Sequence, residues 1–268
     1  AAAHHTVIAH AASTNAMRAV RNDILTGPVL NQARHVADDL SDPVQAHAAD
    51  IGDAHQNRFW MDAFMQGKYP QILIDSYGDE LTSVIKDGDL QAATVKNDFI
   101  GINYYFDNRV GKSLGGKPEW HSISGLFDLD IDETPRGPLT DMGWPLTPEG
   151  LEGLLVRWHN EYGSKLPDLY ITENGVAYDE GPDANGRVAD QRRIDYLQTH
   201  LKAISNAIAK GSPVKGYYQW SLMDNFEWAL GYDKRFGIVH VDFDTQKRII
   251  KDSGYWYRDQ IKSNGSTI

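Results

Sequence analysis

The sequence of 268 residues contains no cysteine, which excludes a disulfide scaffold, cysteine-ligated zinc and a cysteine nucleophile. It also has no apolar run near the roughly 18 residues that a membrane-spanning helix needs, so we expect no membrane partner. Blocks rich in Lys and Arg are missing as well. The 26 Lys and Arg residues stand against 37 Asp and Glu residues, which gives a formal net charge of −11. Such an acidic surface repels phosphate groups, and nucleic acid is not expected as a partner.

What the chain does contain is an ordinary globular composition with many aromatic residues. Hydrophobic residues make up 41% and charged residues 24% of the sequence, and a chain of this length can bury a large core. The aromatic residues are 7 Trp, 13 Tyr and 8 Phe. The ten His residues show no spacing that indicates a metal site. We expect neither a metal nor another cofactor.

Apolar stretches alternate with helical patterns along the chain. The stretches 98–106, 168–172 and 214–220 have the nearly continuous apolar pattern of strands buried on both faces. A shorter strand is expected at 29–36, and a long loop at 107–145. Helices are expected at 1–22, at 58–65, at 147–162, from Asp190 as the cap to Gly211, and at 252–262.

This alternation indicates a parallel α/β fold. The chain has about four strand–helix units, without an internal repeat or a low-complexity linker, so we interpret residues 1–268 as one domain. A complete barrel of eight units needs roughly 250 residues. Four units in 268 residues mean that the loops are long, that the chain is part of a larger fold, or both.

Polar residues follow two of the predicted strands, at the ends where parallel barrels carry their functional groups. Glu173 is one of them, although a single carboxylate there also suits a helix cap or a loop. The other strand end carries Trp220, Glu227 and Trp228. Core packing accounts for a lone tryptophan but not for two beside acidic and amide groups. Aromatic surfaces beside polar groups are suited to sugar rings.

A third strand end carries Asn103 and Tyr105, which share one face by the period-two rule of strands. If that face lines the mouth of a barrel, an amide and a phenol lie near Glu173. The alternative is a tyrosine packed between strand and helix. Further along the chain, Lys234 and Arg235 are interpreted as residues of a solvated loop.

Several segments carry a family resemblance. They are 171–175 (ITENG), 220–228 (WSLMDNFEW), the Ala-His-His helix at the start and 252–257 (DSGYWY). On these motifs the chain resembles the C-terminal part of glycoside hydrolase family 1, the retaining β-glucosidase family. The resemblance implies a (β/α)8 TIM barrel, of which this chain supplies about the C-terminal half, strands five to eight, without the N-terminal strands.

The resemblance also implies roles for single residues. Glu173 matches the nucleophile, and Tyr105 and Asn103 match the residues beside it. A retaining hydrolase uses two carboxyl groups about 5 to 5.5 Å apart. The residues that match sugar-binding positions are Trp220, Glu227, Trp228 and Phe236 at the non-reducing end and Trp144 on the leaving-group side.

The sequence departs from the family at the acid/base glutamate. The Asn-Glu-Pro motif that carries this residue does not occur in the chain. Glu227 is a second candidate carboxylate, but the family motif assigns it to sugar binding. Relatives that act on 6-phosphorylated sugars have Ser and Tyr where this chain has Glu227 and Phe236, so the resemblance favours non-phosphorylated glycosides.

The sequence therefore predicts retaining hydrolysis of non-reducing terminal β-D-glucosides or short oligosaccharides, with β-galactosides and β-fucosides as further candidates. The expected partner is the N-terminal half of the same barrel, in the same polypeptide or as a separate chain. The alternative is a non-catalytic glycan-binding relative or an inactive fragment. The intact Glu173 and Tyr105 oppose this alternative, and the absent acid/base residue favours it. The start of the chain has no signal-peptide pattern, so a cytoplasmic location is expected.

Overall fold

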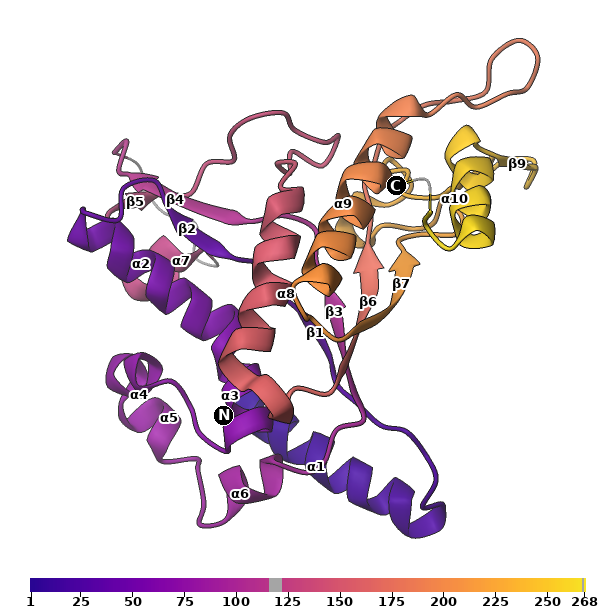
Figure 1. The fold of residues 1–268 in the computed structure, drawn as a ribbon. Helices are drawn as coiled ribbons and strands as arrows, with labels where there is room; N and C mark the ends of the chain where they lie inside the picture. Colours follow the sequence, from indigo (N-terminus) through magenta and orange to yellow (C-terminus); the bar gives the residue numbers. More distant parts are fainter. Residues whose placement is uncertain (116–121, 267) are drawn as a thin grey trace.

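Four parallel strands form the sheet at the centre of the molecule (Figure 1). The computed structural model describes residues 1–115, 122–266 and 268. Spatial order follows chain order, as in the wall of a β/α barrel, and the predicted parallel α/β fold is confirmed. The strands lie in the order β1 (Val29–Asn31), β3 (Phe99–Asn103), β6 (Asp168–Asn174) and β7 (Val214–Gln219).

Helices connect and cover these strands. Helices α8 and α9 pack against each other in front of the sheet (Figure 1). Among the described residues, no helix is both long and apolar enough to cross a lipid bilayer. The longer helices are α1 (Ala2–Val20), α2 (Pro43–Asp53), α8 (Pro148–Tyr162), α9 (Gln191–Ala209) and α10 (Asp252–Ser263). The shorter segments are a π-helical turn (Ala54–Arg58), α3 (Phe59–Gln66), α4 (Gln71–Tyr77), α5 (Asp79–Thr82), α6 (Asp89–Ala93), α7 (Ile123–Phe127) and two 3-10 turns (Gly163–Lys165 and Trp228–Leu230).

The stretch 29–36, predicted as one strand, divides between two sheets. Its first part is β1, and its last residues belong to β2 (His35–Ala37). Between them, the backbone N–H of Ala33 donates to the Asn57 side chain, and the carbonyl of Ala33 accepts from it. These hydrogen bonds take the place of pairing with β3, so the chain leaves the central sheet after β1.

The segment 107–145, predicted as a loop, also contains strands. β4 (Asn108–Lys112) pairs in parallel with β2 and antiparallel with β5 (Ile131–Asp132). Residues 116–121 of this segment lie outside the described residues. A separate antiparallel hairpin is formed by β8 (Val239–Val241) and β9 (Arg248–Ile250).

Helix α9 differs from its prediction in two ways. Asp190 occupies the cap position, but its carboxylate binds Arg193 and Ser253 instead of capping the helix. The spacing of the apolar residues Ile194, Leu197, Leu201, Ile204 and Ile208 predicts that they share one buried face. Ile208 is nevertheless 49% exposed, while Arg193 and His200 are buried. A buried arginine is tolerated when its charge is paired and hydrogen-bonded, and the Asp190 contact explains how the helix turns this residue inward.

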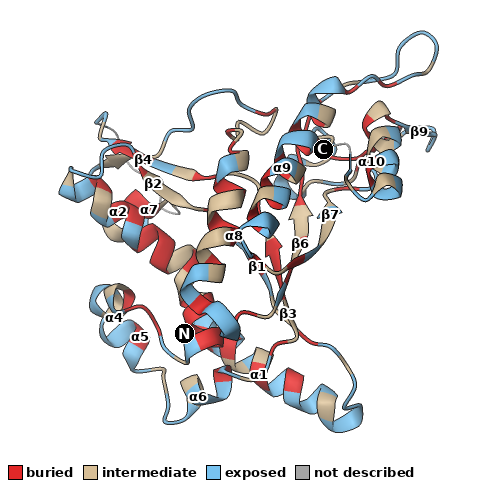
Figure 2. Ribbon diagram, viewed as in Figure 1, coloured by how far each residue is buried: buried red, intermediate tan, exposed pale blue. Residues whose placement is uncertain are grey.

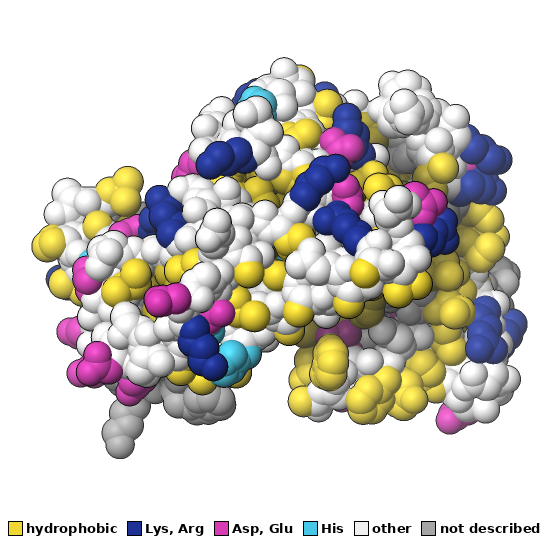
Figure 3. Space-filling view, turned by 90° about the horizontal axis from the view of Figure 1, so that it is seen from below, with side chains coloured by type: hydrophobic (Ala, Val, Ile, Leu, Met, Phe, Trp, Pro, Cys, Tyr) yellow, Lys and Arg dark blue, Asp and Glu magenta, His cyan; other side chains and the backbone are white. Residues whose placement is uncertain are grey.

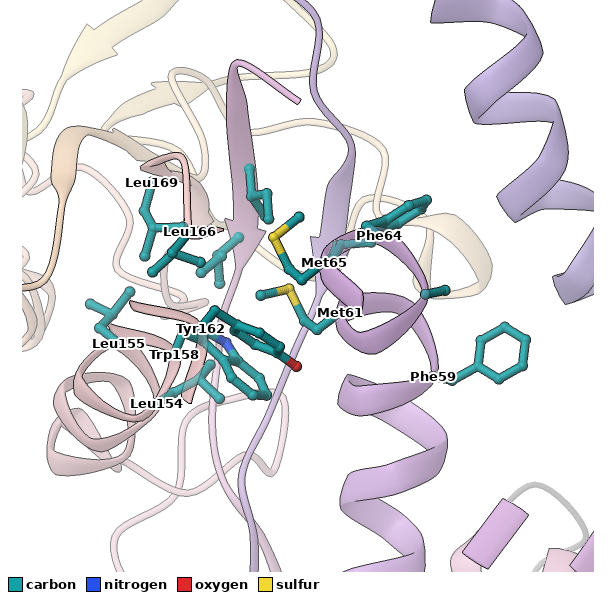
Figure 4. Packing of buried hydrophobic residues seen from close by; sticks show 14 of the residues in the cluster. Phe59, Met61, Phe64, Met65, Leu154, Leu155, Trp158, Tyr162, Leu166 and Leu169 are labelled. Carbon is teal, nitrogen blue, oxygen red and sulfur yellow. The ribbon is translucent and has the colours of Figure 1, made fainter. Parts of the chain in front are cut away.

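The core lies between α8 and the central sheet, and buried residues line both elements (Figure 2). Leu154, Leu155 and Trp158 point from α8 into this core, opposite Met61 of α3 (Figure 4). The indole N–H of Trp158 donates to Gln32 at 2.8 Å, so its one polar atom is satisfied. This packing supports the sheet whose strand ends carry the candidate site.

We predict that Leu154→Ala lowers the free energy of unfolding by about 2–5 kcal/mol, because it leaves a cavity at a fully buried position. The matched control is Leu40→Ala. Leu40 is 78% exposed, so the same change should shift stability by less than about 0.5 kcal/mol. Urea unfolding followed by tryptophan fluorescence measures both variants. Equal losses would contradict this description of the core.

Candidate active site

Glu173 lies near the carboxyl end of β6, where this strand pairs with β3. Its partner in the ladder is Asn103, and Tyr105 follows β3 directly after Tyr104. The Tyr105 hydroxyl donates a hydrogen bond to Oε2 of Glu173 at 2.7 Å. A phenol and a carboxylate that are 68 residues apart in the sequence are thus in direct contact.

Burial and the neighbouring carboxylate both raise the pKa of Tyr105. Burial of the phenol raises the pKa of Tyr105 far above its ordinary value, and the hydrogen bond with Glu173 and its charge raise this pKa further. The phenol therefore stays protonated at physiological pH. It acts as a permanent hydrogen-bond donor to Glu173.

Asn103 lies beside the site but contacts the residue before Glu173. Its amide oxygen accepts a hydrogen bond from the Thr172 hydroxyl at 2.6 Å. Both Tyr105 and Asn103 are expected beside Glu173. Tyr105 binds the Glu173 carboxylate, whereas Asn103 binds Thr172, the residue before Glu173, and so links β3 to β6. Both arrangements fix the end of the strand that carries Glu173.

Glu227 lies in the loop after β7 and has a partly buried carboxyl group. Its Oε2 is buried and has no hydrogen-bond partner among the described residues. Burial raises the pKa of Glu227, the charge of Glu173 raises it further, and a hydrogen bond with Trp220 lowers it. Buried acceptors without partners are rare in folded proteins. This oxygen is therefore an acceptor that a ligand hydroxyl can use.

Aromatic rings surround Tyr105. The Trp144 ring centroid lies 5.2 Å and the Phe236 centroid 6.3 Å from that of Tyr105. Trp144 and Phe236 are themselves 6.0 Å apart, so the three rings form one cluster. Phe236 is buried, whereas Trp228 in the neighbouring loop is 83% exposed. The structure thus brings Trp144 and Phe236 to the Tyr105–Glu173 pair and leaves Trp228 at the surface of this chain.

A buried carboxylate holds the loop that follows β7, and sequence analysis missed it. Asp224 accepts hydrogen bonds from Arg235 at 2.8 Å, from Lys251 at 3.0 Å and from the backbone N–H of Gly237 at 3.0 Å. Burial lowers the pKa of Lys251 to about 8. The prediction of Arg235 as a solvated loop residue is wrong, because its guanidinium pairs with Asp224. The Asp224 contacts fix the loop on both sides of Phe236.

Arg193 is a second positioning group that the sequence prediction did not include. Its guanidinium donates to the carbonyl groups of Val176, Tyr178, Arg235 and Phe236. The first two carbonyls follow Glu173, and the last two lie in the loop after β7. One buried side chain therefore joins the two loops of the site. Helical spacing indicates that Arg193 is buried, since it lies four residues before the buried Leu197 on the same face of α9.

A cavity of about 960 Å³ opens beside Trp144. Its lining includes Asn31, His35, Trp60 and Phe106. It borders the site on the side of Trp144, and Glu173 is not among its lining residues. In the part of the chain that the structure describes, no group of three His, Asp or Glu residues is arranged to hold a metal ion.

Residues 1–266 match the sequence model described as Glycosyl hydrolase family 1. The chain belongs to this family. Beta-glucosidase A of Thermotoga maritima is 39% identical over 98% of this chain and 56% of that relative. The 6-phospho-beta-galactosidase of Streptococcus equi subsp. zooepidemicus is 40% identical over 82% of this chain and 50% of that relative.

A solved family 1 structure shows the same architecture. The psychrophilic beta-glucosidase from Micrococcus antarcticus has a TM-score of 0.90 and 40% identity, and the match covers 98% of this chain and 58% of that chain. The chain thus spans about half the length of the relatives that it matches. The predicted family and the barrel class are confirmed, and the four-stranded sheet is the C-terminal half of the family 1 barrel.

The electrostatic influence of Glu173 on Glu227 gives a prediction about ionisation. Glu173→Gln should lower the pKa of Glu227 toward its ordinary value, because it removes a negative charge that disfavours ionisation. Part of the shift should remain, since burial is its larger cause. Carbon-13 NMR titration of labelled glutamate carboxyl groups measures the pKa of Glu227 in both proteins. Glu161→Gln is the control, because Glu161 pairs with Arg157 on α8. An unmoved Glu227 pKa in Glu173→Gln would contradict this electrostatic interaction between the two carboxyl groups.

Proposed function

We propose that this chain carries the nucleophile of a retaining β-glycosidase that hydrolyses non-reducing terminal β-D-glucosides, with β-galactosides and β-fucosides as further substrates. The single observation that supports this most directly is the 2.7 Å hydrogen bond from Tyr105 to Oε2 of Glu173. It holds one carboxylate oxygen in place and leaves the other for attack. The related Beta-glucosidase A supports the same substrate class.

The proposed reaction has two steps. A carboxylate oxygen of Glu173 forms a bond to the anomeric carbon while the bond from that carbon to the leaving-group oxygen breaks. The leaving group takes a proton from the acid/base residue, whose motif this sequence lacks. Water then attacks the anomeric carbon and gives its proton back to the acid/base residue, and Glu173 is released with net retention.

The sugar-binding part of the proposal rests on Glu227 and its neighbours. The unpartnered Oε2 of Glu227 would accept hydrogen bonds from sugar hydroxyls, and Trp220 would stack on the apolar face of the ring. Trp228 and Phe236 would complete this subsite. A phosphate on the sugar would be repelled by Glu227. We therefore propose non-phosphorylated glycosides, although some relatives are 6-phospho-beta-galactosidases.

Trp144 would contact the leaving-group side. It contributes both to the aromatic cluster around Tyr105 and to the lining of the 960 Å³ cavity. This double position supports a path from the reacting bond into the cavity. A β-glucoside or a short oligosaccharide would extend along it.

The proposed partner is the N-terminal half of the barrel, supplied by the same polypeptide or by a separate chain. The sheet ends in β1 on one side and β7 on the other, and exposed strand edges tend to pair. Large apolar residues are exposed close to both edges, among them Val29, Tyr218 and Leu222. Hydrophobic side chains also gather in patches on the face shown in Figure 3. Strands added at these edges would close the barrel.

The rival function is non-catalytic glycan binding by a relative or an inactive fragment. The missing acid/base motif favours it, and the neutral phenol held on Glu173 opposes it. The two functions differ in one chemical respect, because only the hydrolase forms a covalent ester on Glu173.

In the assembled enzyme, a 2-fluoro glucoside with a good leaving group should accumulate as an ester on Glu173. Fluorine slows both steps, and the leaving group restores the first. Glu173→Ala should abolish turnover, and azide should partly rescue it by attacking from the vacated space with inversion. Peptide mass spectrometry and product analysis measure these outcomes. A label on Glu227, or near-normal turnover by Glu173→Ala without azide, would overturn the proposal, and Glu161→Ala should behave as the unaltered enzyme.

This chain alone should not hydrolyse aryl-β-glucosides, and it should self-associate through its open sheet edges. Adding the N-terminal half of a family 1 barrel should restore hydrolysis and yield a discrete assembly, because that half supplies the missing acid/base residue. Light scattering and release of nitrophenol measure both effects. Full activity from a monodisperse monomer of this chain would contradict the proposed partner.

A further inference from the structure

The ladders on both sides of Glu173 are irregular. The register between β3 and β6 shifts between Ile102 and Asn103, and that between β6 and β7 shifts between Ile171 and Asn174. Regular ladder pairing therefore does not by itself hold the backbone at Glu173. Another set of contacts has to fix this position.

The side chain of Asn174, the residue after Glu173, supplies these contacts. It is fully buried. Its Nδ2 donates to the carbonyl of Tyr104 and to the hydroxyl of Tyr196, both at 2.8 Å. Its Oδ1 accepts from the Tyr217 hydroxyl at 2.9 Å. A carbonyl can only accept a hydrogen bond, so the contact with Tyr104 requires that Nδ2 of Asn174, and not Oδ1, faces β3. One side chain thus joins the end of β3, helix α9 and strand β7.

The same contacts fix both members of the Tyr105–Glu173 pair. Asn174 directly follows Glu173, and its partner Tyr104 directly precedes Tyr105. The backbone N–H of Tyr104 also donates to the carbonyl of Glu173 at 2.9 Å. Any movement of the Asn174 amide would therefore shift the phenol and the carboxylate relative to each other.

The backbone beyond Asn174 is equally constrained. The N–H of Trp220 donates to the carbonyl of Asn174 at 2.9 Å. A side chain on Gly175 would place its Cβ only 1.8 Å from the Trp220 carbonyl oxygen, so no larger residue fits. The strand end therefore cannot compensate for lost amide contacts by moving closer to Trp220.

We propose that Asn174, held by Tyr217 and Tyr196, is a positioning residue that fixes the orientation of the Glu173 carboxylate for attack on the anomeric carbon. This inference rests on the proposed function. Asn174 acts through Glu173 and does not touch the sugar. Misplacing a reacting group by about 1 Å can cost roughly 10²-fold in rate. Loss of the Asn174 contacts should accordingly reduce kcat and leave KM nearly unchanged, because the Asn174 side chain bonds to none of the proposed sugar-binding residues.

The experiment uses the enzyme assembled from this chain and the N-terminal barrel half. Tyr217→Phe removes one hydroxyl, and it should lower kcat and the rate of inactivation by a 2-fluoro glucoside about tenfold, with KM within about twofold. Tyr162→Phe is the matched control. Tyr162 is a buried tyrosine and Tyr217 a half-buried one, and the Tyr162 hydroxyl donates to Asp62 at 2.8 Å in the core. It should lose comparable stability in urea and keep its kcat.

A second variant tests the amide itself. Asn174→Asp has the same shape but replaces the donor by a carboxylate oxygen that would face the Tyr104 carbonyl, and it should lower kcat about 100-fold. Hydrogen exchange gives a readout that does not require activity. The amides of Tyr104 and Trp220 should exchange faster in Tyr217→Phe than in Tyr162→Phe.

Three results would overturn the inference: an unchanged kcat in Tyr217→Phe, a fall no larger than in Tyr162→Phe, or a change confined to KM. Unchanged amide exchange in Tyr217→Phe would overturn it as well. Failure of the proposed function has a different signature. In that case the unaltered assembly forms no ester on Glu173, while the exchange measurement still tests whether Asn174 holds the strand end.

Discussion

The pairing of β3 with β6, including its one-residue irregularity, is the constraint on which the candidate site depends. Ile102 pairs with Ile171 and Asn103 pairs with Glu173, so Thr172 has no partner in the ladder. In a regular ladder Glu173 would oppose Tyr104 and point to the other face, because successive side chains of a strand alternate. A bulge changes the direction in which side chains point. This bulge places the Glu173 side chain on the same face of the sheet as Tyr105. The hydrogen bond between them follows from that register.

Buried ion pairs then determine how the loops lie around this contact. Asp224 gathers Arg235 and Lys251, and Arg193 pairs with Asp190 while it donates to carbonyl groups of both loops. Pairing mainly offsets the cost of removing such charges from water and adds little net stability. Their effect is on conformation. They join the segments after β6 and β7 in the arrangement in which Phe236 lies beside the Tyr105 phenol.

Local patterns predicted the strands and the polar residues at their ends, because buried parallel strands are apolar runs and functional groups follow them. Partners that are distant in the sequence could not be predicted in this way. The 29–36 stretch divides because Asn57 bonds to Ala33, and Arg235 is turned away from solvent and half-buried because Asp224 pairs with it. The bulge at Thr172 is likewise a property of two strands together. The period-two rule put Asn103 and Tyr105 on one face, but it gave no register for Glu173.

The geometry at Glu173 and its dielectric surroundings have different origins. Tyr105 and Asn174 fix the carboxylate through bonds within this chain alone. Trp228 is nevertheless 83% exposed here, and β1 and β7 are sheet edges. Electrostatic contacts strengthen when water is excluded. On the proposed function, strands added at those edges would cover the loop of Trp228, increase the burial of Glu227 and strengthen the hydrogen bond from Tyr105. On the same proposal, the C-terminal half orients Glu173 as the nucleophile, and closure of the barrel excludes water from its surroundings.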